Sequence, residues 1–513
     1  MRFTSELWYN QKEMKALVMK RMSLAIAAVA VCTMGSARAE RFDYGRLLVE
    51  DGPRKGLKVE DNVRWLEEGK VPDYAVANVI KWLSLKGVDV AKFRVRYSPV
   101  EPGLGEPLAK RPGFRLGYML DVSRDKMPTL DTLKRIADIL AAVGFNEFQL
   151  YTECTFAYTG LEPAWREWTP MTAAETRELA EYCRGKGLLL VPNQNSFGHL
   201  EKLFRHKEYR SLAETPNGYT IEHPPLKNRP PCALCPTDER TYAFLDGLYA
   251  ELLPNFPGAT AINVGCDEVW DIFDKKGRSA AKAAKSGVPR VYMDHMLKVH
   301  DLLKKRGFRM AFWADMALYE PALLDEIPKD AIPLQWGYGA EEFDAGYTCE
   351  FEGRCLALKR RGLSYYVCPS TRTYGKSFGD WPRMSGNVRL TVAAARRYDA
   401  MGLLLTTWGD GGHRAPFLAE IPALVYTAAQ VRGEDPSEAE VNARAWEVAK
   451  LMPGCVEVGE ATRDLLKEID AAKADGTIAG KRGAFATRYS ELWLRHNRVG
   501  GLLSSLREVG LVD

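Results

Sequence analysis

The sequence lacks a strong excess of charge of either sign, and it contains no concentrated basic segment. Its 71 lysine and arginine residues stand against 67 aspartate and glutamate residues, for a formal net charge of +4. A protein that binds nucleic acid through its phosphates needs a basic patch, usually with aromatic residues among the basic ones. The composition therefore gives no reason to expect a nucleic-acid partner.

The sequence also has no apolar run near its N-terminus that is long enough to cross a bilayer. Residues 22–31 are apolar but too short to span one, and the small-x-small sequence at 37–39 resembles a signal-peptidase site. A positive region precedes the apolar stretch, at Lys15, Lys20 and Arg21. These features predict a signal peptide at 1–39, cleavage near Ala39, and an exported, periplasmic or extracellular, mature chain without a transmembrane segment.

Two alternatives remain at this end of the chain. Translation starting at Met14 or Met19 would place the basic region closer to the start of the signal. Cys32 would suit a lipoprotein, but Val31 before it is too bulky for a good lipidation site. The sequence therefore favours a soluble exported protein.

Cysteine pairing is restricted by an odd count. Ten cysteines are present, and removal of Cys32 with the signal leaves nine, which cannot all pair within one chain. Cys232 and Cys235 form a C-x-x-C in a proline-rich loop, but a second ligand pair at zinc-site spacing is lacking. The two are expected to form a local disulfide or to remain free thiols, and no metal or other cofactor is expected.

No glycine-rich phosphate loop follows the first predicted strand, which argues against a doubly wound nucleotide-binding sheet. Instead, a strand and a helix alternate eight times between residues 114 and 431, which predicts a (β/α)8 TIM barrel. A capping box at 172–175 begins one helix, which is expected to end at Gly185. The predicted strands are 115–121, 147–152, 188–195, 261–268, 309–315, 331–338, 364–370 and 402–410.

Two smaller segments flank the predicted barrel. Residues 40–113 are expected to form a small N-terminal α/β segment that ends in a linker rich in proline and glycine. Residues 432–513 are mainly helical in pattern and predict a C-terminal helical appendage. The clearest flanking elements are a helix at 76–85, a strand at 93–97, and helices at 461–474 and 484–496.

The stretch from Ala261 to Glu268 carries the strongest chemical signal. It is a short apolar strand that ends in two adjacent carboxylates, Asp267 and Glu268. Active sites of barrels are built at the carboxyl ends of their strands. Two carboxylates held close together tend to have different pKa values, with one of them raised. Such a pair is suited to the cleavage of a glycosidic bond.

Carboxylates and aromatic rings recur at the ends of the other predicted strands. Because these ends converge in a barrel, we expect an aromatic cup with acids at its rim, which suits a pyranose ring. The residues concerned are Asp121, Arg124, Glu153, Cys154, Asn195, His199, Trp313, Asp315, Trp336, Tyr338, Tyr374, Trp408 and Asp410.

Four short motifs lie at these strand ends in order. They are Gly117–Arg124 (GYMLDVSR), Ser196–His199 (SFGH), Gly265–Glu268 (GCDE) and Trp408–Asp410 (WGD). Together they resemble glycoside hydrolase family 20, the β-N-acetylhexosaminidases, and the last is similar to that family's final-strand Trp-x-acid element. The resemblance spans about residues 114–430 and is closest to a divergent bacterial branch.

The resemblance implies exo-acting, retaining hydrolysis of glycans that carry a terminal GlcNAc or GalNAc. The substrate's own 2-acetamido oxygen would attack the anomeric carbon to form an oxazolinium, so no protein nucleophile and no cofactor would be needed. By match to the family motif, Glu268 would be the general acid, and Asp267 would hold the acetamido N–H. His199 and Glu153 would form a His–carboxylate pair supporting the acid. Sugar-binding residues would be Trp313, Trp336, Trp408 and Asp410.

Several positions depart from the family pattern. The first-strand arginine that grips sugar hydroxyls lies one position away from its match, at Arg115. Cys154 replaces the second acid of a pair, and the stretch 263–268 lacks the histidine and second glycine of His-x-Gly-Gly-Asp-Glu. The tyrosine that holds the acetamido oxygen is expected to be Tyr374, with Tyr338 as the alternative.

Two other functions remain open on the residues alone. One is a barrel glycosidase acting on other sugars with two separated carboxylates, such as Glu268 with Asp315 or Asp410. The other is a catalytically inactive carbohydrate-binding barrel, against which the intact Asp267–Glu268 pair argues. The choice between GlcNAc and GalNAc and the oligomeric state are not determined at this level.

Overall fold

The computed structural model describes residues 58–69, 71, 79, 80, 83, 87–93, 106–222, 225–319, 321–339 and 348–512. The predicted signal peptide lies outside the described residues, as does the strand predicted at 93–97 except for Phe93, which is helical. The chain divides into two compact units, residues 1–103 with 342–357, and residues 104–341 with 358–513. The domain boundaries drawn from the sequence stay predictions.

In the first unit, the described part contains helix α3 (Val59–Glu68). The helix ends at Gly69, whose left-handed φ of 69° lets its N–H reach the last turn. The described residues of the predicted helix 76–85, which are 79, 80 and 83, are helical.

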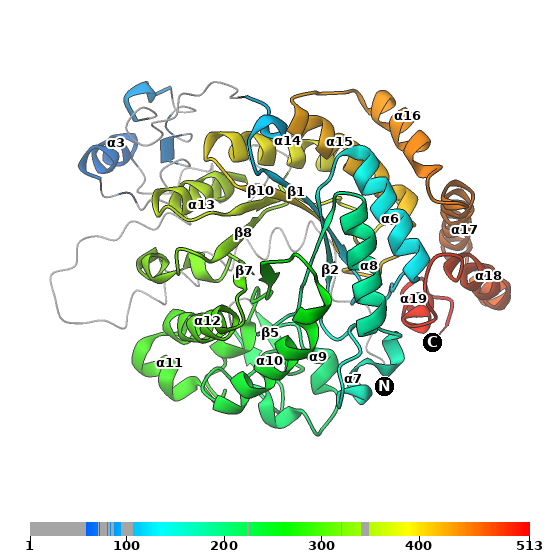
Figure 1. Ribbon diagram of the computed structural model, residues 1–513, viewed down its shortest axis with the longest axis horizontal. Coiled ribbons are helices and arrows are strands. Elements are labelled where there is room, and N and C mark those ends of the chain that lie inside the picture. Colours follow the sequence, from blue (N-terminus) through cyan, green and yellow to red (C-terminus); the bar gives the residue numbers. More distant parts are fainter. Residues whose placement is uncertain are drawn as a thin grey trace. The chain divides into compact units, whose positions relative to one another are not determined.

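The second unit contains eight parallel strands arranged as a barrel (Figure 1). Their hydrogen-bonded order is β3-β2-β1-β10-β9-β8-β7-β6, and a parallel bridge between Asn193 and Asn263 closes the ring between β3 and β6. The predicted (β/α)8 fold is confirmed. The strands are β1 (Arg115–Asp121), β2 (Glu147–Tyr151), β3 (Leu189–Val191), β6 (Ala261–Asn263), β7 (Arg309–Trp313), β8 (Ile332–Trp336), β9 (Tyr366–Cys368) and β10 (Gly402–Thr407).

Each predicted strand matches an observed one, but several are shorter than predicted. The first matches throughout, because its residues 116–121 are all buried and 117–120 pair on both sides, with β2 and β10. The fourth ends at Asn263, five residues early, because positive φ angles at Gly265, Cys266 and Glu268 turn the backbone out of the ladder.

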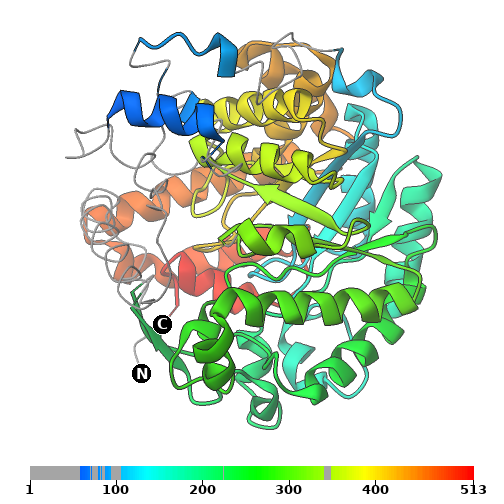
Figure 2. The ribbon, with the colours of Figure 1, turned by 90° about the vertical axis from the view of Figure 1, so that its left-hand side faces the viewer.

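Helices surround the strands and bury one face each. In α6 the buried residues Leu133, Ile136, Ala137 and Leu140 recur at helical spacing, so this face packs inward. The predicted capping box is present in α8: the Thr172 N–H donates to Glu175 Oε2 at 2.9 Å, and the helix ends at Gly185 as expected. Figure 2 shows the long α12 outside the strands, and this helix contacts β7.

The remaining elements of the barrel unit follow in chain order. The longer helices are α6 (Leu130–Val143), α8 (Ala173–Gly185), α10 (Glu239–Leu252), α12 (Val288–Lys305), α14 (Trp381–Arg397) and α15 (Ile421–Arg432). Helix α13 (Thr348–Arg360) follows β8 in sequence, and most of it belongs to the first unit. Short elements are α7 (Glu162–Trp165), α9 (Glu201–Phe204), α11 (Ala280–Ser286) and the antiparallel strands β4 (Tyr219–Ile221) and β5 (Leu226–Arg229).

The C-terminal part is helical, as predicted. Helices α16 (Glu438–Ala449), α17 (Cys455–Ala474), α18 (Ile478–Trp493) and α19 (Leu502–Glu508) follow the barrel. The predicted helices 461–474 and 484–496 correspond to α17 and α18, which begin earlier. Figure 1 shows these helices in orange and red on the side of α6, which α16 contacts. Of the helices that the structure describes, none combines the length and apolarity needed to cross a membrane.

Candidate active site

The loop after β6 has an unusual backbone. Gly265, Cys266 and Glu268 have φ angles of 68°, 71° and 46°, a region that residues other than glycine seldom adopt. The surrounding structure holds this conformation: the Gly265 N–H donates to Asn263 Oδ1 at 3.0 Å, and Tyr292 donates to the Cys266 carbonyl at 2.8 Å. Strained backbone of this kind is typical of active sites, where it fixes side-chain direction.

Substitution of Gly265 tests this constraint. In Gly265→Ala the new Cβ would overlap Asn195 Oδ1 at a left-handed φ. We expect a loss of about 1–3 kcal/mol of unfolding free energy, measured by denaturant titration. Gly247→Ala is the matched control, because Gly247 lies within α10 and a Cβ there meets no atom within 4 Å. Equal stability of the two variants would contradict the predicted constraint.

Asp267, in this loop, forms an ion pair with His199. His199 Nε2 lies 3.3 Å from Asp267 Oδ2 and 4.0 Å from Glu268 Oε2. Burial disfavours the charged imidazolium, but the Asp267 carboxylate outweighs burial and raises the pKa of His199 to about 10. The prediction that His199 pairs with Glu153 is wrong, because the left-handed backbone of His199 (φ 57°) directs the ring to Asp267.

Glu268 keeps its proton more strongly than an ordinary glutamate. Burial raises its pKa, and the neighbouring Asp267 and Asp410 carboxylates raise it further, against the opposing charges of His199 and Arg124. This direction agrees with the one expected from two adjacent acids. The Glu268 side chain nevertheless remains 45% exposed, so its carboxyl can reach a bound molecule.

Asp315, from the end of β7, is the third carboxyl at this point. It is buried, and its Oδ2 accepts the Glu268 N–H at 3.3 Å. Burial, with the charges of Asp267 and Glu268, raises the pKa of Asp315 well above its usual range. Asp315 therefore supports the backbone of Glu268 and holds its own proton more strongly than an ordinary aspartate.

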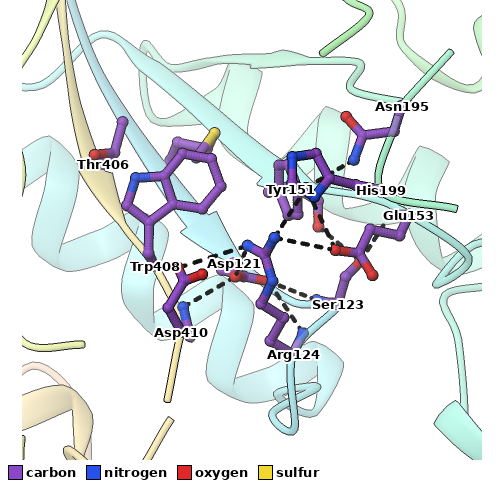
Figure 3. A network of polar contacts seen from close by, with 12 residues as sticks. Asp121, Ser123, Arg124, Tyr151, Glu153, Asn195, His199, Thr406, Trp408 and Asp410 are labelled. Carbon is purple, nitrogen blue, oxygen red and sulfur yellow. Dashed lines mark hydrogen bonds and ion pairs between the residues drawn. The ribbon is translucent and has the colours of Figure 1, made fainter. Parts of the chain in front are cut away.

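Arg124 lies at the centre of a network of acids from several strand ends (Figure 3). Its guanidinium nitrogens are 3.0 Å from Asp121 Oδ2, 3.4 Å from Glu153 Oε1 and 3.7 Å from Asp410 Oδ2. Its guanidinium carbon is 5.0 Å from the centre of the Tyr151 ring. Asp410 remains more than one-third exposed, so Arg124 and Asp410 together form a charged edge open to a ligand.

Arg115 lies at the other end of β1. It is exposed at the first position of the strand, close to Glu147 at the start of β2, whereas Arg124 follows the last residue of β1. The prediction that Arg115 grips sugar hydroxyls is therefore wrong for this structure. Arg124 is the arginine that reaches the site. The sequence had already placed Arg124, in the first motif just beyond β1, among the strand-end residues, but it had not given Arg124 this role.

Aromatic rings form the wall beside these acids. The Trp336 and Tyr338 ring centres are 5.3 Å apart, and Tyr338 and Tyr374 are 6.4 Å apart. All three rings are half-buried, and Trp408 is 8% exposed. Trp313 is 0% exposed, so the prediction that it contacts the sugar is wrong. It supports Trp408 from within the core, with the two ring centres 5.7 Å apart.

Buried oxygens at the site that have no protein hydrogen-bond partner include Asp267 Oδ1, Asn195 Oδ1 and Asp315 Oδ1. The other oxygen of Asp267, Oδ2, is paired with His199, and Asn195 Nδ2 donates to Tyr151 at 2.7 Å. Buried polar atoms are nearly always satisfied in folded proteins. An unpartnered carboxylate oxygen beside an aromatic wall is therefore arranged to accept a hydrogen bond from a ligand.

Cys232 and Cys235 do not form the local disulfide that the sequence left open. Cys232 and Cys235 are free and buried, which confirms the free-thiol alternative. The Cys232 thiol donates to Asp271 Oδ1 at 3.5 Å, and Cys235 lies 3.3 Å from the Thr237 hydroxyl. Cys154, which follows Glu153, is also free and buried.

Comparisons with known proteins agree with this geometry. A family model described as "Glycosyl hydrolase family 20, catalytic domain" matches residues 163–348. Human hexosaminidase D is 24% identical over 313 residues, which is 58% of this chain and 60% of that protein. A beta-hexosaminidase of Akkermansia muciniphila is 23% identical over 234 residues, covering 40% of this chain and 45% of the relative.

A solved structure shares the barrel. The chitobiase of Flavobacterium johnsoniae superposes with a TM-score of 0.51 at 18% identity, covering 69% of this chain and 53% of the chitobiase. This similarity supports the fold. The matched regions span no more than about three-fifths of the length of these relatives.

Proposed function

We propose that this protein, a divergent member of glycosyl hydrolase family 20, is an exo-β-N-acetylhexosaminidase that releases terminal GlcNAc or GalNAc from glycans. The observation that carries the proposal is Asp267, which is paired through Oδ2 and unpartnered at the buried Oδ1, directly beside a glutamate whose pKa is raised. The names of the relatives, hexosaminidase D and beta-hexosaminidase, support the same class of substrate.

Asp267 is suited to hold the substrate's acetamido group. Its free Oδ1 would accept the acetamido N–H, while the pairing with His199 fixes the carboxylate in place. The acetamido oxygen would then attack the anomeric carbon, and positive charge would develop on the nitrogen. A fixed carboxylate beside that nitrogen stabilises this charge more than it stabilises the neutral substrate, as catalysis requires.

Glu268 would move the proton in both steps. In the first step it donates its proton to the glycosidic oxygen as the bond to the anomeric carbon breaks, which leaves a carboxylate and an oxazolinium ion. In the second step that carboxylate takes a proton from water. The water oxygen bonds to the anomeric carbon, the acetamido group is restored, and the sugar leaves with its original β configuration.

The hydrogen bonds around Tyr338 and Tyr374 suit either tyrosine to hold the acetamido oxygen. Trp408 Nε1 donates to the Tyr338 hydroxyl at 2.6 Å, and Thr406 Oγ1 lies 3.5 Å from it. Because the hydroxyl oxygen accepts these bonds, its own proton is directed elsewhere and suits a carbonyl acceptor. The Tyr374 hydroxyl likewise accepts, from Arg372, so its proton is also available to a carbonyl acceptor.

The alternative of two separated carboxylates is less well supported by this geometry. Asp315 is buried behind Glu268 with a raised pKa, which disfavours a nucleophilic carboxylate. Asp410 lies 3.7 Å from Arg124, where it is suited to sugar hydroxyls.

Hydrolysis of three aryl β-glycosides tests the proposed function. We expect cleavage of N-acetylglucosaminide or N-acetylgalactosaminide, and at least about 100-fold slower cleavage of plain glucoside, because only the acetamido sugars contain the internal nucleophile. Release of the aryl alcohol is followed by absorbance, and NMR of the initial product reports whether the β configuration is retained. Equal rates on glucoside, or an initial α-sugar product, would exclude the acetamido mechanism.

A further inference from the structure

We propose that the C-terminal helices position the loops that carry Arg124 and Asp410, and that Arg498 fastens the first of these loops, the one after β1, to the loop before α8. The inference rests on the proposed function, because these two residues are the ones that we expect to contact sugar hydroxyls. Arg498 would be a positioning residue, since it acts through the loops and does not touch the substrate.

The segment between α18 and α19 pairs with the loop after β1. The Arg498 N–H donates to the Met127 carbonyl at 2.7 Å, and the Thr129 N–H donates to the His496 carbonyl at 3.0 Å. Pro128 and Asn497 form an antiparallel bridge between these two bonds. The loop after β1, residues 122–129, therefore gains a short added strand only three residues from Arg124.

The Arg498 side chain extends this contact to the loop before α8. It is 17% exposed, and its Nη2 donates to Glu175 Oε1 at 2.7 Å. Its Nη1 donates to the Pro170 carbonyl at 3.0 Å, and its Nε donates to the Pro128 carbonyl at 3.3 Å. One guanidinium thus joins two loops of the active-site end with charge-assisted hydrogen bonds, which are the stronger kind.

The loop after β10, which carries Asp410, is bonded to the loop after β1. Lys126 Nζ donates to the Ala415 carbonyl and lies 5.8 Å from the Trp493 ring of α18. The Gly409 N–H donates to Asp121 Oδ2 at 2.9 Å, next to Asp410 (Figure 3). The positions of Arg124 and Asp410 therefore depend on one set of contacts that includes the C-terminal helices.

A pocket of about 60 Å³ lies between the barrel and the C-terminal helices, lined by Lys126, His413 and Trp493 among others. The directed bonds of Arg498 and Lys126 join the two sides beside it.

The loop after β6, which carries Asp267 and Glu268, is held by contacts that do not involve the C-terminal helices. Its contacts include those to Tyr292 on α12, to Asn263, to Asp315 and to His199, and none of these four residues lies in the C-terminal helices. Loosening the loops of Arg124 and Asp410 should therefore weaken sugar binding while leaving the reactive groups in place. Such a change raises KM and alters kcat much less.

The test uses the full-length protein with Arg498→Met, assayed on aryl β-N-acetylglucosaminide. We expect KM to rise by about tenfold, with kcat changed by less than about threefold. Arg498→Lys should show a smaller rise in KM than Arg498→Met. Lysine keeps one charged contact with Glu175, but it cannot make the several bonds that the guanidinium makes to Pro128, Pro170 and Glu175 at once. Glu175→Gln should also raise KM, because it removes the charge that Arg498 contacts. Glutamine can still complete the capping box of α8, so the helix start is preserved.

Arg488→Met is the matched control. Arg488 lies on α18 and pairs with Glu468 of α17 at 2.6 and 2.9 Å, so its removal deletes an equal charge and an ion pair within the same helices. Its KM should equal that of the native protein. An unchanged KM in Arg498→Met would overturn the inference, because Arg498 would then have no influence on sugar binding. Equal KM increases in the two variants would also overturn it, because they would show only a general stability effect.

Hydrogen–deuterium exchange separates this inference from the proposed function. Amides of residues 122–129 should exchange about tenfold faster in Arg498→Met than in Arg488→Met, whatever the enzyme hydrolyses. Equal exchange in the two variants would overturn the positioning role. A native protein that cleaves no N-acetylhexosaminide would overturn the proposed function alone, and the exchange result would still decide the role of Arg498.

Discussion

Glu268→Gln is expected to lower kcat on N-acetylhexosaminides with poor leaving groups by about 10²–10⁴-fold, the usual contribution of a general acid. The glutamine keeps the shape of the protonated side chain but cannot donate the proton that a poor leaving group needs. The loss should be smaller on aryl substrates whose leaving group is stable without protonation. Steady-state kinetics on a natural disaccharide and on an activated aryl glycoside measure this difference.

Glu147→Gln is a suitable control for this variant. Glu147 is a second buried glutamate whose pKa is raised by burial, but it lies at the start of β2, the end of the barrel away from Glu268. Its substitution should leave kcat close to native. Equal activity of native protein and Glu268→Gln on both substrates would remove Glu268 from the role of acid.

The pH dependence of the native enzyme's activity is a second test of the role of Glu268. Burial and two neighbouring carboxylates raise the pKa of Glu268, so its acidic form persists above the range of an ordinary glutamate. Activity that depends on this proton should therefore fall as pH rises through the raised value. The high-pH limb should be absent from Glu268→Gln.

Asp267→Asn is expected to lower kcat by about 10²–10³-fold on every acetamido substrate, activated or not, which is the range for loss of one group that stabilises transition-state charge. Asparagine removes the negative charge that would offset the developing positive charge on the acetamido nitrogen. It also leaves His199, which lies 3.3 Å away, without its counter-ion.

Two measurements check the Asp267 variant. Kinetics should show similar losses on substrates with good and poor leaving groups, unlike the pattern of Glu268→Gln. NMR titration should show the pKa of His199 falling from about 10, because burial then acts without the carboxylate. The control is Asp330→Asn, which disrupts another His–Asp pair, with His300 at 2.9 Å. A comparable kinetic loss in the control would contradict a specific role for Asp267.

The sequence by itself determined the barrel and the location of its chemistry. Apolar runs bounded by glycine, capping residues and helical spacing are local signals, and they identified all eight strands and the start of α8. The acid pair after the fourth strand was evident because adjacent carboxylates at a strand exit require no knowledge of distant contacts.

Only the tertiary structure decided which groups act together. His199 pairs with Asp267 and not with Glu153 because of a left-handed backbone, which sequence spacing does not reveal. Arg124 replaces Arg115 because the two lie at opposite ends of β1. Contacts between residues hundreds of positions apart, such as Arg498 with Glu175, arise only when the chain closes on itself, and local pattern carries no record of them.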